Sequence, residues 1–224
     1  MMSSNTNNRR SVILDRDGTL VVDTGFVHRV TDLRLLDGVV PGLRRLAALG
    51  FHLVIATNQS GVARGLFSEV DMHAFNEALC RRLRAEGITI EAVYCSTVHP
   101  TEGIGKYRCD SPLRKPRPGM ILQAAAEHDL DLAASYVVGD KKSDILAGQA
   151  AGCRTVLLAT GAGGRGEEEL SAQADHLAAD MEAAAEWIES DMHRTVGPSG
   201  TQLRNHGQED LTQRRKGAKK SVSS

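Results

Sequence analysis

Apolar positions in this chain fall into short continuous runs that alternate with longer stretches of helical spacing. Short apolar runs that end in polar clusters predict buried strands, and apolar residues three or four positions apart predict helices. The predicted strands cover residues 11–14, 51–56, 92–96, 136–139 and 154–158, and the predicted helices cover 40–49, 68–86, 119–128, 143–151, 167–173 and 181–189. This alternation predicts an α/β fold with a Rossmann-like, mostly parallel sheet flanked by helices.

Residues near the ends of two predicted helices support these boundaries. Pro41 is tolerated in a first helical turn, and Gly50 is a natural helix stop. Ser68 is a suitable N-cap, and Asp71 lies in the first turn of the same helix. The local signals therefore agree with the periodicity.

The two ends of the chain are polar and are predicted to be disordered. Residues 1–10 precede the first strand, and residues 191–224 contain almost no apolar side chains. Such segments bury too little surface to offset the entropy of ordering. We therefore expect one folded domain over residues 11–190. The RRKGAKK run of the tail could contact nucleic acid, but a solvated tail without a function is the favoured reading.

The overall composition excludes several classes of protein. The formal net charge is -1, with no basic stripe outside the tail, so nucleic acid is not an expected partner. No apolar run reaches the ~18 residues of a membrane span, and the N-terminus lacks the apolar segment of a signal peptide. The chain has four cysteines, too few for a disulfide framework at this length. We expect a cytoplasmic protein with reduced thiols and no membrane partner.

Two carboxylates follow the first predicted strand, in the segment Asp15-Arg16-Asp17-Gly18-Thr19. If the backbone stays extended there, both side chains point to one side. One carboxylate can then attack phosphorus and form an aspartyl-phosphate, while the other transfers a proton. Their mutual repulsion raises a pKa or requires a cation. The alternative is a solvated Asp-Gly turn, and this segment alone favours neither reading.

Two further polar clusters carry groups that suit phosphate. Thr57 begins the segment TNQSG, in which a hydroxyl and backbone N–H groups can bind phosphate oxygens, and Arg64 follows soon after. Arg114 and Lys115 lie in RKPRPG, where their charges can neutralise a phosphoryl group. Taken singly, an ordinary helix cap and a solvated basic loop would explain these two clusters.

The last cluster, GDKKSD, follows the strand predicted at 136–139. Asp140 would complete an oxygen-rich site suited to Mg²⁺, and Asp144 would support this loop or stabilise a helix N-terminus. Ligands of open α/β sheets bind at the carboxyl ends of the strands. Because the clusters follow different strands of one predicted sheet, we expect them to form a single site.

Together these segments resemble the haloacid dehalogenase (HAD) superfamily of phosphohydrolases. DRDGT resembles its first motif, Thr57 the second, Lys115 the third and GDKKSD the fourth. The segments DRDGTL, VDTGFVH, LLDGV, TNQSGVARG, RKPRPGM and VGDKKSD are more specific and resemble the D-glycero-D-manno-heptose 1,7-bisphosphate 7-phosphatase group. The phosphatase domains of histidinol-phosphatase and of polynucleotide kinase-phosphatases are near relatives of that group. The resemblance covers about residues 11–190 and, because no long insertion separates Asp23 from Pro41, implies a HAD-like fold without a large cap domain.

The resemblance implies a role for each matching residue. Asp15 is implied as nucleophile and Mg²⁺ ligand, Asp17 as general acid/base that also offers an oxygen to the metal, and Asp140 as the remaining ligand. Thr57 and Lys115 are implied to bind the transferring phosphate. The implied substrate-side residues are Asp23, Thr24, Gly25, Phe26, Asn58, Gln59, Ser60, Arg114 and Lys141.

The sequence departs from this group at a structural zinc that its members often carry, on a C-x-H element and a C-x-C element. After Cys95 the histidine, His99, is displaced by one residue, and Cys109 is followed by Asp110 rather than by a second cysteine nearby. Tetrahedral zinc requires four ligands. Cys95, His99 and Cys109 could hold zinc with a water or Asp110, but a buried Cys95 and a loop Cys109 without metal is the favoured reading.

The expected function is Mg²⁺-dependent removal of phosphate from a small phosphorylated sugar by a monomeric enzyme, with the heptose 7-phosphate as the implied target. Histidinol phosphate or another sugar phosphate would use the same chemistry. A nucleic-acid 3′-phosphatase and a non-catalytic binding protein are alternatives of other classes. The near-neutral charge counts against the first of these, and the complete set Asp15, Asp17, Lys115 and Asp140 counts against the second.

Overall fold

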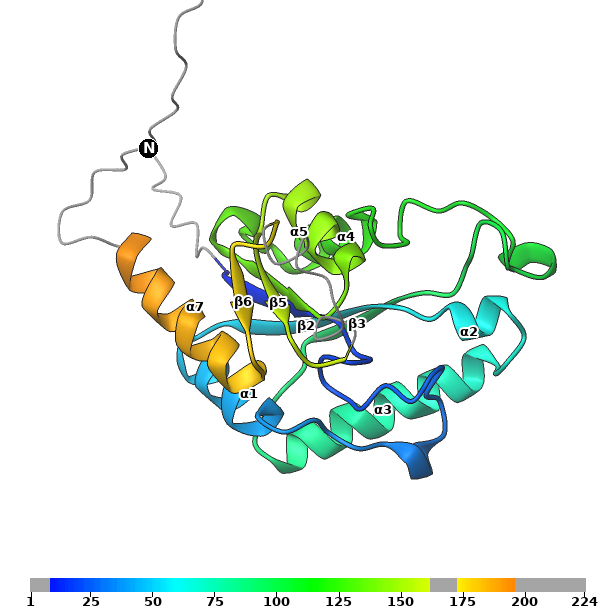
Figure 1. Cartoon of the computed structure of the whole chain (residues 1–224), viewed down its shortest axis with the longest axis horizontal. Coiled ribbons are helices and arrows are strands. Elements are labelled where there is room, and N and C mark those ends of the chain that lie inside the picture. Colours follow the sequence, from blue (N-terminus) through cyan, green and yellow to red (C-terminus); the bar gives the residue numbers. More distant parts are fainter. Residues whose placement is uncertain (1–8, 162–172, 196–224) are drawn as a thin grey trace, which may run out of the picture.

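The computed structural model describes residues 9–161 and 173–195 and contains one six-stranded sheet (Figure 1). Its strands are β1 (Ser11–Leu14), β2 (His52–Asn58), β3 (Ala92–Ser96), β4 (Tyr136–Gly139), β5 (Arg154–Leu158) and β6 (His176–Ala178). The spatial order is β3-β2-β1-β4-β5-β6, and every neighbouring pair is parallel. The chain therefore builds outward from β1 in both directions, and the predicted parallel α/β fold is confirmed.

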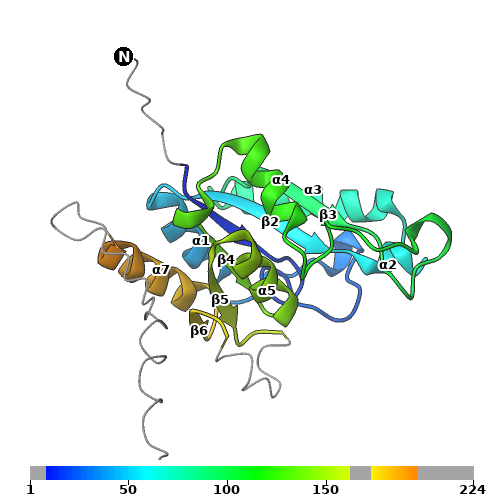
Figure 2. The same cartoon turned by 90° about the horizontal axis from the view of Figure 1, so that it is seen from above.

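Helices cover both faces of the sheet. One face carries α1 (Val39–Ala48), α3 (Glu69–Ala85) and α7 (Met181–Thr195), and the other carries α4 (Gly119–His128) and α5 (Lys142–Ala151) (Figures 1 and 2). The pleat of β1 explains how one strand serves both faces, since successive side chains point in opposite directions. Val12 and Leu14 belong to the core under α1, α3 and α7, whereas Ile13 belongs to the core under α4 and α5.

The segment between β1 and α1 stays short. Residues 15–38 contain one short 3-10 helix, η1 (Val30–Asp32), so no cap domain is inserted there, as predicted. Three other loops contain one short helix each: the four-residue helix α2 (Ser60–Ala63) and the 3-10 helices η2 (Gly105–Tyr107) and η3 (Leu132–Ala134). Within the described ranges, no helix has the length and apolar character that crossing a membrane requires.

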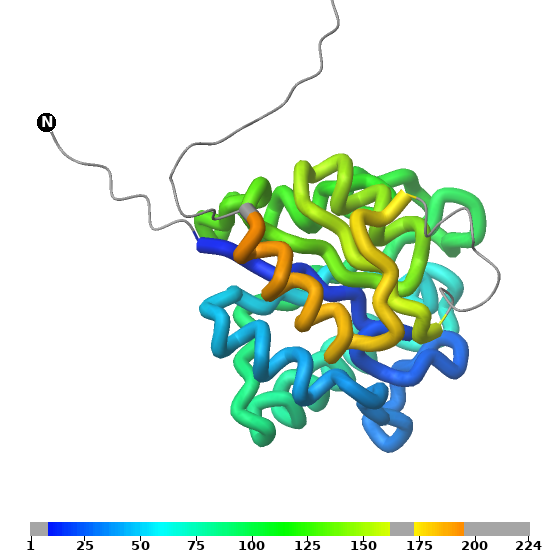
Figure 3. Tube along the Cα trace, turned by 60° about the vertical axis from the view of Figure 1, so that its left-hand side comes forward, coloured from blue at the N-terminus to red at the C-terminus, as the bar shows by residue number. Residues whose placement is uncertain are grey.

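Ordered structure runs beyond the predicted limits of the domain. Helix α7 continues to Thr195 and lies beside α1 (Figure 3). The periodicity underestimated this helix because its last turns are held by polar contacts: buried Asp191 accepts a hydrogen bond from Tyr136 Oη at 2.9 Å and pairs with Arg154 at 2.6 Å. At the other end, Arg9 pairs with Glu91, and its carbonyl accepts a bond from the Asp131 N–H at 3.0 Å.

Other element boundaries differ by small amounts. Strand β2 continues through Thr57 and Asn58, which were predicted to lie beyond it, and the short edge strand β6 was not predicted. Residues 167–172 of the helix predicted at 167–173 lie outside the described residues, as do residues 1–8 and 196–224 of the segments predicted to be disordered at 1–10 and 191–224.

Candidate active site

The polar clusters of the sequence meet at one edge of the sheet. Asp15 directly follows β1, and Asp140 directly follows β4. Thr57 is the last residue but one of β2. β1 lies between β2 and β4, and all three run in the same direction. The crevice at the carboxyl ends of such strands is where open α/β sheets bind their ligands.

Three buried carboxylates form the centre of this site. Asp15, Asp140 and Asp144 each place an oxygen within 4.8 Å of the others, and in the part of the chain that the structure describes this is the one such group of three metal-ligating side chains. A cluster of anions shielded from water requires a neutralising cation. Hard carboxylate oxygens with room for water and phosphate suit Mg²⁺. The donor set therefore fits the predicted metal, and it includes Asp144, which sequence reasoning had assigned only a supporting role.

Lys115 supplies positive charge to the same cluster. Its Nζ lies 2.8 Å from Asp15 Oδ1 and 2.7 Å from Asp144 Oδ1, and it donates to the carbonyl of Ala56 at 2.6 Å. Burial lowers the pKa of Lys115, but Asp144 and Asp15 outweigh burial and raise it. Burial likewise raises the pKa of Asp15, but Lys115 and then Lys141 outweigh it and hold that pKa below its ordinary value. Asp15 is therefore ionised at neutral pH, as a nucleophile must be.

Two glycines pack tightly around the carboxylate of Asp140. A Cβ on Gly18 would lie 2.3 Å from Asp140 Oδ2, and a Cβ on Gly161 would lie 2.4 Å from the same atom. Gly18 also has a φ of +86°, which favours glycine. Thr19 donates to Asp140 Oδ1 at 3.4 Å. The backbone of both loops thus approaches Asp140 so closely that its oxygens have little freedom to move.

Asp17 follows Asp15 by two residues, but its carboxylate is bound by Arg16 and Gln59. Arg16 donates to both of its oxygens, at 2.8 and 2.9 Å, and Gln59 Nε2 donates to Oδ2 at 2.8 Å. Burial raises the pKa of Asp17, and the opposing charge of Arg16 only partly offsets this. The carbonyl of Asp17 accepts a bond from Lys141 Nζ at 3.3 Å. A carboxyl with a raised pKa beside an ionised one is the arrangement that suits a proton donor.

Several predicted substrate-side residues hold the loops of the site. Asn58 exchanges two hydrogen bonds with the backbone of Lys115, at 2.9 and 3.1 Å, and so ties β2 to the RKP loop. Gln59 also donates to Thr57 Oγ1 at 2.9 Å. Asp23 accepts a bond from its own turn, at the N–H of Gly25, and lies 3.3 Å from Lys141 Nζ. Thr24 and Phe26 are exposed in that turn, and Ser60 begins α2.

Two arginines lie together at the rim of the site. The pKa of Arg114 is lowered by burial and by the nearby charge of Arg64, and Arg114 donates to the carbonyl of Val98 at 3.0 Å. The guanidinium of Arg64 lies 5.3 Å from the centroid of the exposed Phe26 ring and pairs with Glu102. Its Nε is buried and has no hydrogen-bond partner. Glu102 offsets part of this positive charge, and the unused Nε donor of Arg64 can bind a further anion.

The residues of the alternative zinc site are not brought together. Cys95 is half-buried and accepts a hydrogen bond from Asn76 at 3.3 Å, while Cys109 is exposed in the following loop. His99 Nδ1 accepts the backbone N–H of Glu102 at 3.0 Å. No group of three metal-ligating side chains within the described ranges contains any of these residues.

The sequence signals for Arg16 and Arg64 were present but carried no assignment. Arg16 stands between the two aspartates of the first motif, yet a residue between two functional ones is normally read as a spacer. Its 1% exposure is what marks it as part of the site. Arg64 was noted near TNQSG, but its proximity to Arg114 depends on the folding of two distant loops.

Comparison with known proteins first identifies the class. A family model described as HAD-hyrolase-like matches residues 112–184, which include Lys115, Asp140 and Asp144. With a buried, ionised aspartate directly after the first strand of a parallel sheet, the fold and the site match those of HAD-like hydrolases.

Individual relatives then identify the family. The chain is 44% identical over 154 residues to the D-glycero-beta-D-manno-heptose-1,7-bisphosphate 7-phosphatase of Pasteurella multocida, which covers 68% of this chain and 83% of the relative. It is also 44% identical over 149 residues to the corresponding alpha enzyme of Burkholderia mallei, over 66% of this chain and 79% of the relative. The crystal structure of D,D-heptose 1.7-bisphosphate phosphatase from B. bronchiseptica, complexed with magnesium and phosphate, has a TM-score of 0.70 at 32% identity, covering 81% of this chain and 99% of that one. The chain therefore belongs to the heptose-bisphosphate phosphatase family of HAD-like phosphoric monoester hydrolases.

Proposed function

We propose that this chain hydrolyses the 7-phosphate of D-glycero-D-manno-heptose 1,7-bisphosphate through an aspartyl-phosphate on Asp15. The observation that carries the proposal is the buried group of Asp15, Asp140 and Asp144 around Lys115, in a family named for this reaction. A binding protein would have no need of an ionised carboxylate held in this way. Relatives named for the alpha and the beta substrate match at equal identity, so the preferred anomer is a matter for the assay.

Magnesium is part of the proposal. Asp15 and Asp140 would hold the ion with the backbone carbonyl of Asp17, and Asp144 lies within reach of the same position. When bound, Mg²⁺ offsets the repulsion between the anionic nucleophile and the anionic phosphate. The structure of the B. bronchiseptica relative with magnesium and phosphate supports this assignment.

The side chains of the site supply the remaining chemistry. An oxygen of Asp15 attacks the phosphorus in line and forms a P–O bond as the bond to the sugar oxygen breaks. Asp17 gives a proton to the leaving sugar oxygen and then takes one from the water that hydrolyses the aspartyl-phosphate. Thr57 and Lys115 hold the oxygens of the transferring group, where they stabilise charge by their fixed positions.

The second phosphate of the substrate accounts for the arginines at the rim. Arg64 and Arg114 lie close enough for their charges to interact, and Arg64 Nε is buried without a hydrogen-bond partner. We propose that they bind the 1-phosphate while the 7-phosphate meets Asp15. Arg64→Met should then raise KM for the bisphosphate about tenfold or more, the effect of losing one charged hydrogen bond. It should leave the rate with heptose 7-phosphate nearly unchanged.

The direct test is phosphate release from heptose 1,7-bisphosphate, with and without Mg²⁺. Histidinol phosphate and an aryl phosphate serve as competing substrates, and Asp15→Asn serves as the inactive control. A strong, Mg²⁺-dependent preference for the heptose is the expected result. Activity confined to histidinol phosphate would keep the mechanism but show that the heptose is not the substrate. Activity retained by Asp15→Asn would contradict the mechanism. Cytoplasmic location and the monomeric state stay predictions.

A further inference from the structure

Among the described residues, the most deeply buried basic side chain is that of Arg16, which the proposed chemistry does not use. It is 1% exposed, and its guanidinium lies 4.5 Å from the centroid of the Phe75 ring. Taking a cation out of water is costly unless its donors are satisfied. An apolar residue could fill this space without that cost, so the charge requires an explanation of its own.

The donors of Arg16 are shared between Asp17 and three other groups. Nε and Nη2 donate to the two oxygens of Asp17, at 2.8 and 2.9 Å. Nη2 also donates to the carbonyl of Val27 at 2.8 Å and to Gln59 Oε1 at 3.0 Å, while Nη1 donates to Asn76 Oδ1 at 2.8 Å. The planar guanidinium is thus fixed from several sides, and its forked donors define the plane of the carboxylate.

Gln59 closes the arrangement on the side of the reacting groups. Its Nε2 donates both to Asp17 Oδ2 at 2.8 Å and to Thr57 Oγ1 at 2.9 Å, while its Oε1 accepts from Arg16. The amide therefore links the carboxylate that would transfer a proton to the hydroxyl that would bind phosphate. Arg16 determines which way this amide points, since only the oxygen can face the guanidinium.

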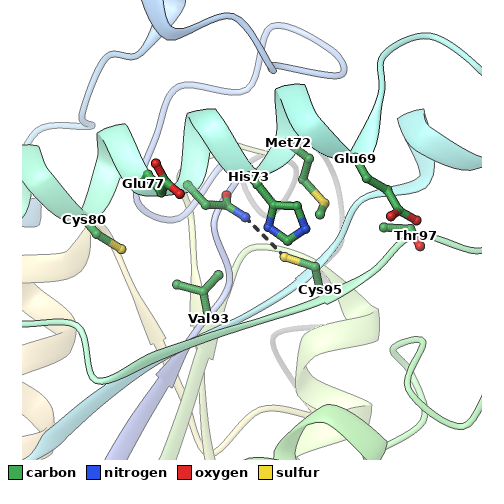
Figure 4. A pocket seen from close by; sticks show the side chains of 9 residues that line it. Glu69, Met72, His73, Glu77, Cys80, Val93, Cys95 and Thr97 are labelled. Carbon is green, nitrogen blue, oxygen red and sulfur yellow. Dashed lines mark hydrogen bonds between the residues drawn. The ribbon is translucent and has the colours of Figure 1, made fainter.

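Asn76 anchors the other end of the guanidinium to helix α3. Its side chain accepts from Arg16 and donates to Cys95 Sγ at 3.3 Å, the bond drawn as a dashed line in Figure 4. Asn76 lines a cavity of about 440 Å³ between α3 and β3, and none of the three clustered aspartates lines it. Arg16 thus ties Asp17 to helix α3 through Asn76, in addition to the loop that carries Val27.

We propose that Arg16 is a positioning residue that holds Asp17 in the orientation required to protonate the leaving oxygen. This inference rests on the proposed function, because it requires Asp17 to act as the acid. The alternative is a buried ion pair that stabilises the fold without any part in the reaction. The two readings differ in whether the activity lost on replacing Arg16 depends on the leaving group of the substrate.

The test compares two substrates that differ in their need for an acid. A sugar alkoxide leaves only with a proton, whereas p-nitrophenolate leaves without one, so only the sugar phosphate depends on the orientation of Asp17. The measured quantity is kcat/KM, which reports the steps up to formation of the aspartyl-phosphate. Arg16→Lys keeps the charge and removes the fork. We expect it to lower kcat/KM about 10- to 100-fold for heptose 1,7-bisphosphate and no more than about threefold for p-nitrophenyl phosphate.

Two further variants keep the outcome decisive. Asn76→Ala removes one anchor of the guanidinium at a distance from Asp17 and should show the same substrate dependence at smaller size, even where Arg16→Lys folds poorly. Arg45→Lys, on the exposed face of α1, is the matched control and should change neither rate. Equal losses with both substrates in the Arg16 and Asn76 variants, or no loss, would overturn the inference.

Asp17→Asn separates this inference from the proposed function. One outcome is that Asp17→Asn lowers kcat/KM selectively for the sugar phosphate while the Arg16 and Asn76 variants do not. In that case Asp17 is the acid, and the positioning role of Arg16 is wrong. If Asp17→Asn shows no dependence on the leaving group, the acid role assigned to Asp17 is wrong, and the positioning role is wrong with it.

Discussion

Replacement of Gly18 by alanine tests whether the close approach of the backbone holds Asp140 in place. Gly18 has a φ of +86°, a conformation that costs a residue with a side chain about 1–2 kcal/mol. The added Cβ would lie 2.3 Å from Asp140 Oδ2 and 2.7 Å from its Cγ, whereas ordinary contacts begin at 3.4 Å. The difference between 3.4 and 2.3 Å means that the carboxylate must move by about 1 Å.

Asp140 has no free space into which it could move without consequence. It is fully buried, and the Cβ position of Gly161 lies 2.4 Å from the same oxygen. A displacement of about 1 Å in a positioned group lowers a rate about 100-fold. We therefore expect Gly18→Ala to lower kcat about 100-fold and to raise the Mg²⁺ concentration for half-maximal activity. Phosphate release measured across a Mg²⁺ titration gives both quantities.

Gly50 provides a matched control. Its φ is +83°, almost that of Gly18, but a Cβ there would meet nothing within 4 Å. Gly50→Ala should lose the same 1–2 kcal/mol in urea unfolding and keep wild-type activity. If Gly18→Ala has the kcat and the Mg²⁺ dependence of Gly50→Ala, the backbone does not hold Asp140 and the reasoning fails.

Two other predictions concern the charges of the chain. Lys115→Met should cost about 3–5 kcal/mol in urea unfolding without Mg²⁺, because it leaves Asp15 and Asp144 buried without their cation. Added Mg²⁺ should restore much of this stability but not the activity, and equal stability without the metal would contradict the prediction. Burial raises the pKa of Glu91, but the bonds from His52 and Arg9 outweigh it and lower that pKa. Ionised Glu91 should therefore add about 0.5–1 kcal/mol to the free energy of unfolding. This stabilisation should be complete above the ordinary pKa of about 4.3 and disappear as the pH falls through the lowered pKa. Glu91→Gln should be less stable than wild type at pH 7, and this difference should narrow as the pH falls below about 4.3. A difference that stays constant as the pH falls would refute this.

The sequence by itself determined the order of elements and most of the reacting groups. Strands such as Ser11–Leu14 and Tyr136–Gly139 were predicted with their observed bounds, since continuous apolar runs followed by polar clusters are local signals. Asp15, Thr57 and Asp140 could be assigned to one edge because parallel strands end on the same side of a sheet. That conclusion requires the fold class but no knowledge of any side-chain contact.

Only the tertiary structure decided which polar residues share the buried space behind that edge. Asp144 joins the carboxylate group because Lys115, far from it in sequence, reaches between it and Asp15. Arg16 is buried because α3 brings Asn76 and Phe75 to it, and Asp191 belongs to the fold because Tyr136 and Arg154 bind it. In each case a polar residue is ordered by a partner that periodicity does not reveal. The free energy of burying such a group depends on the hydrogen bonds and charges that meet it there, and these exist only once the chain has folded.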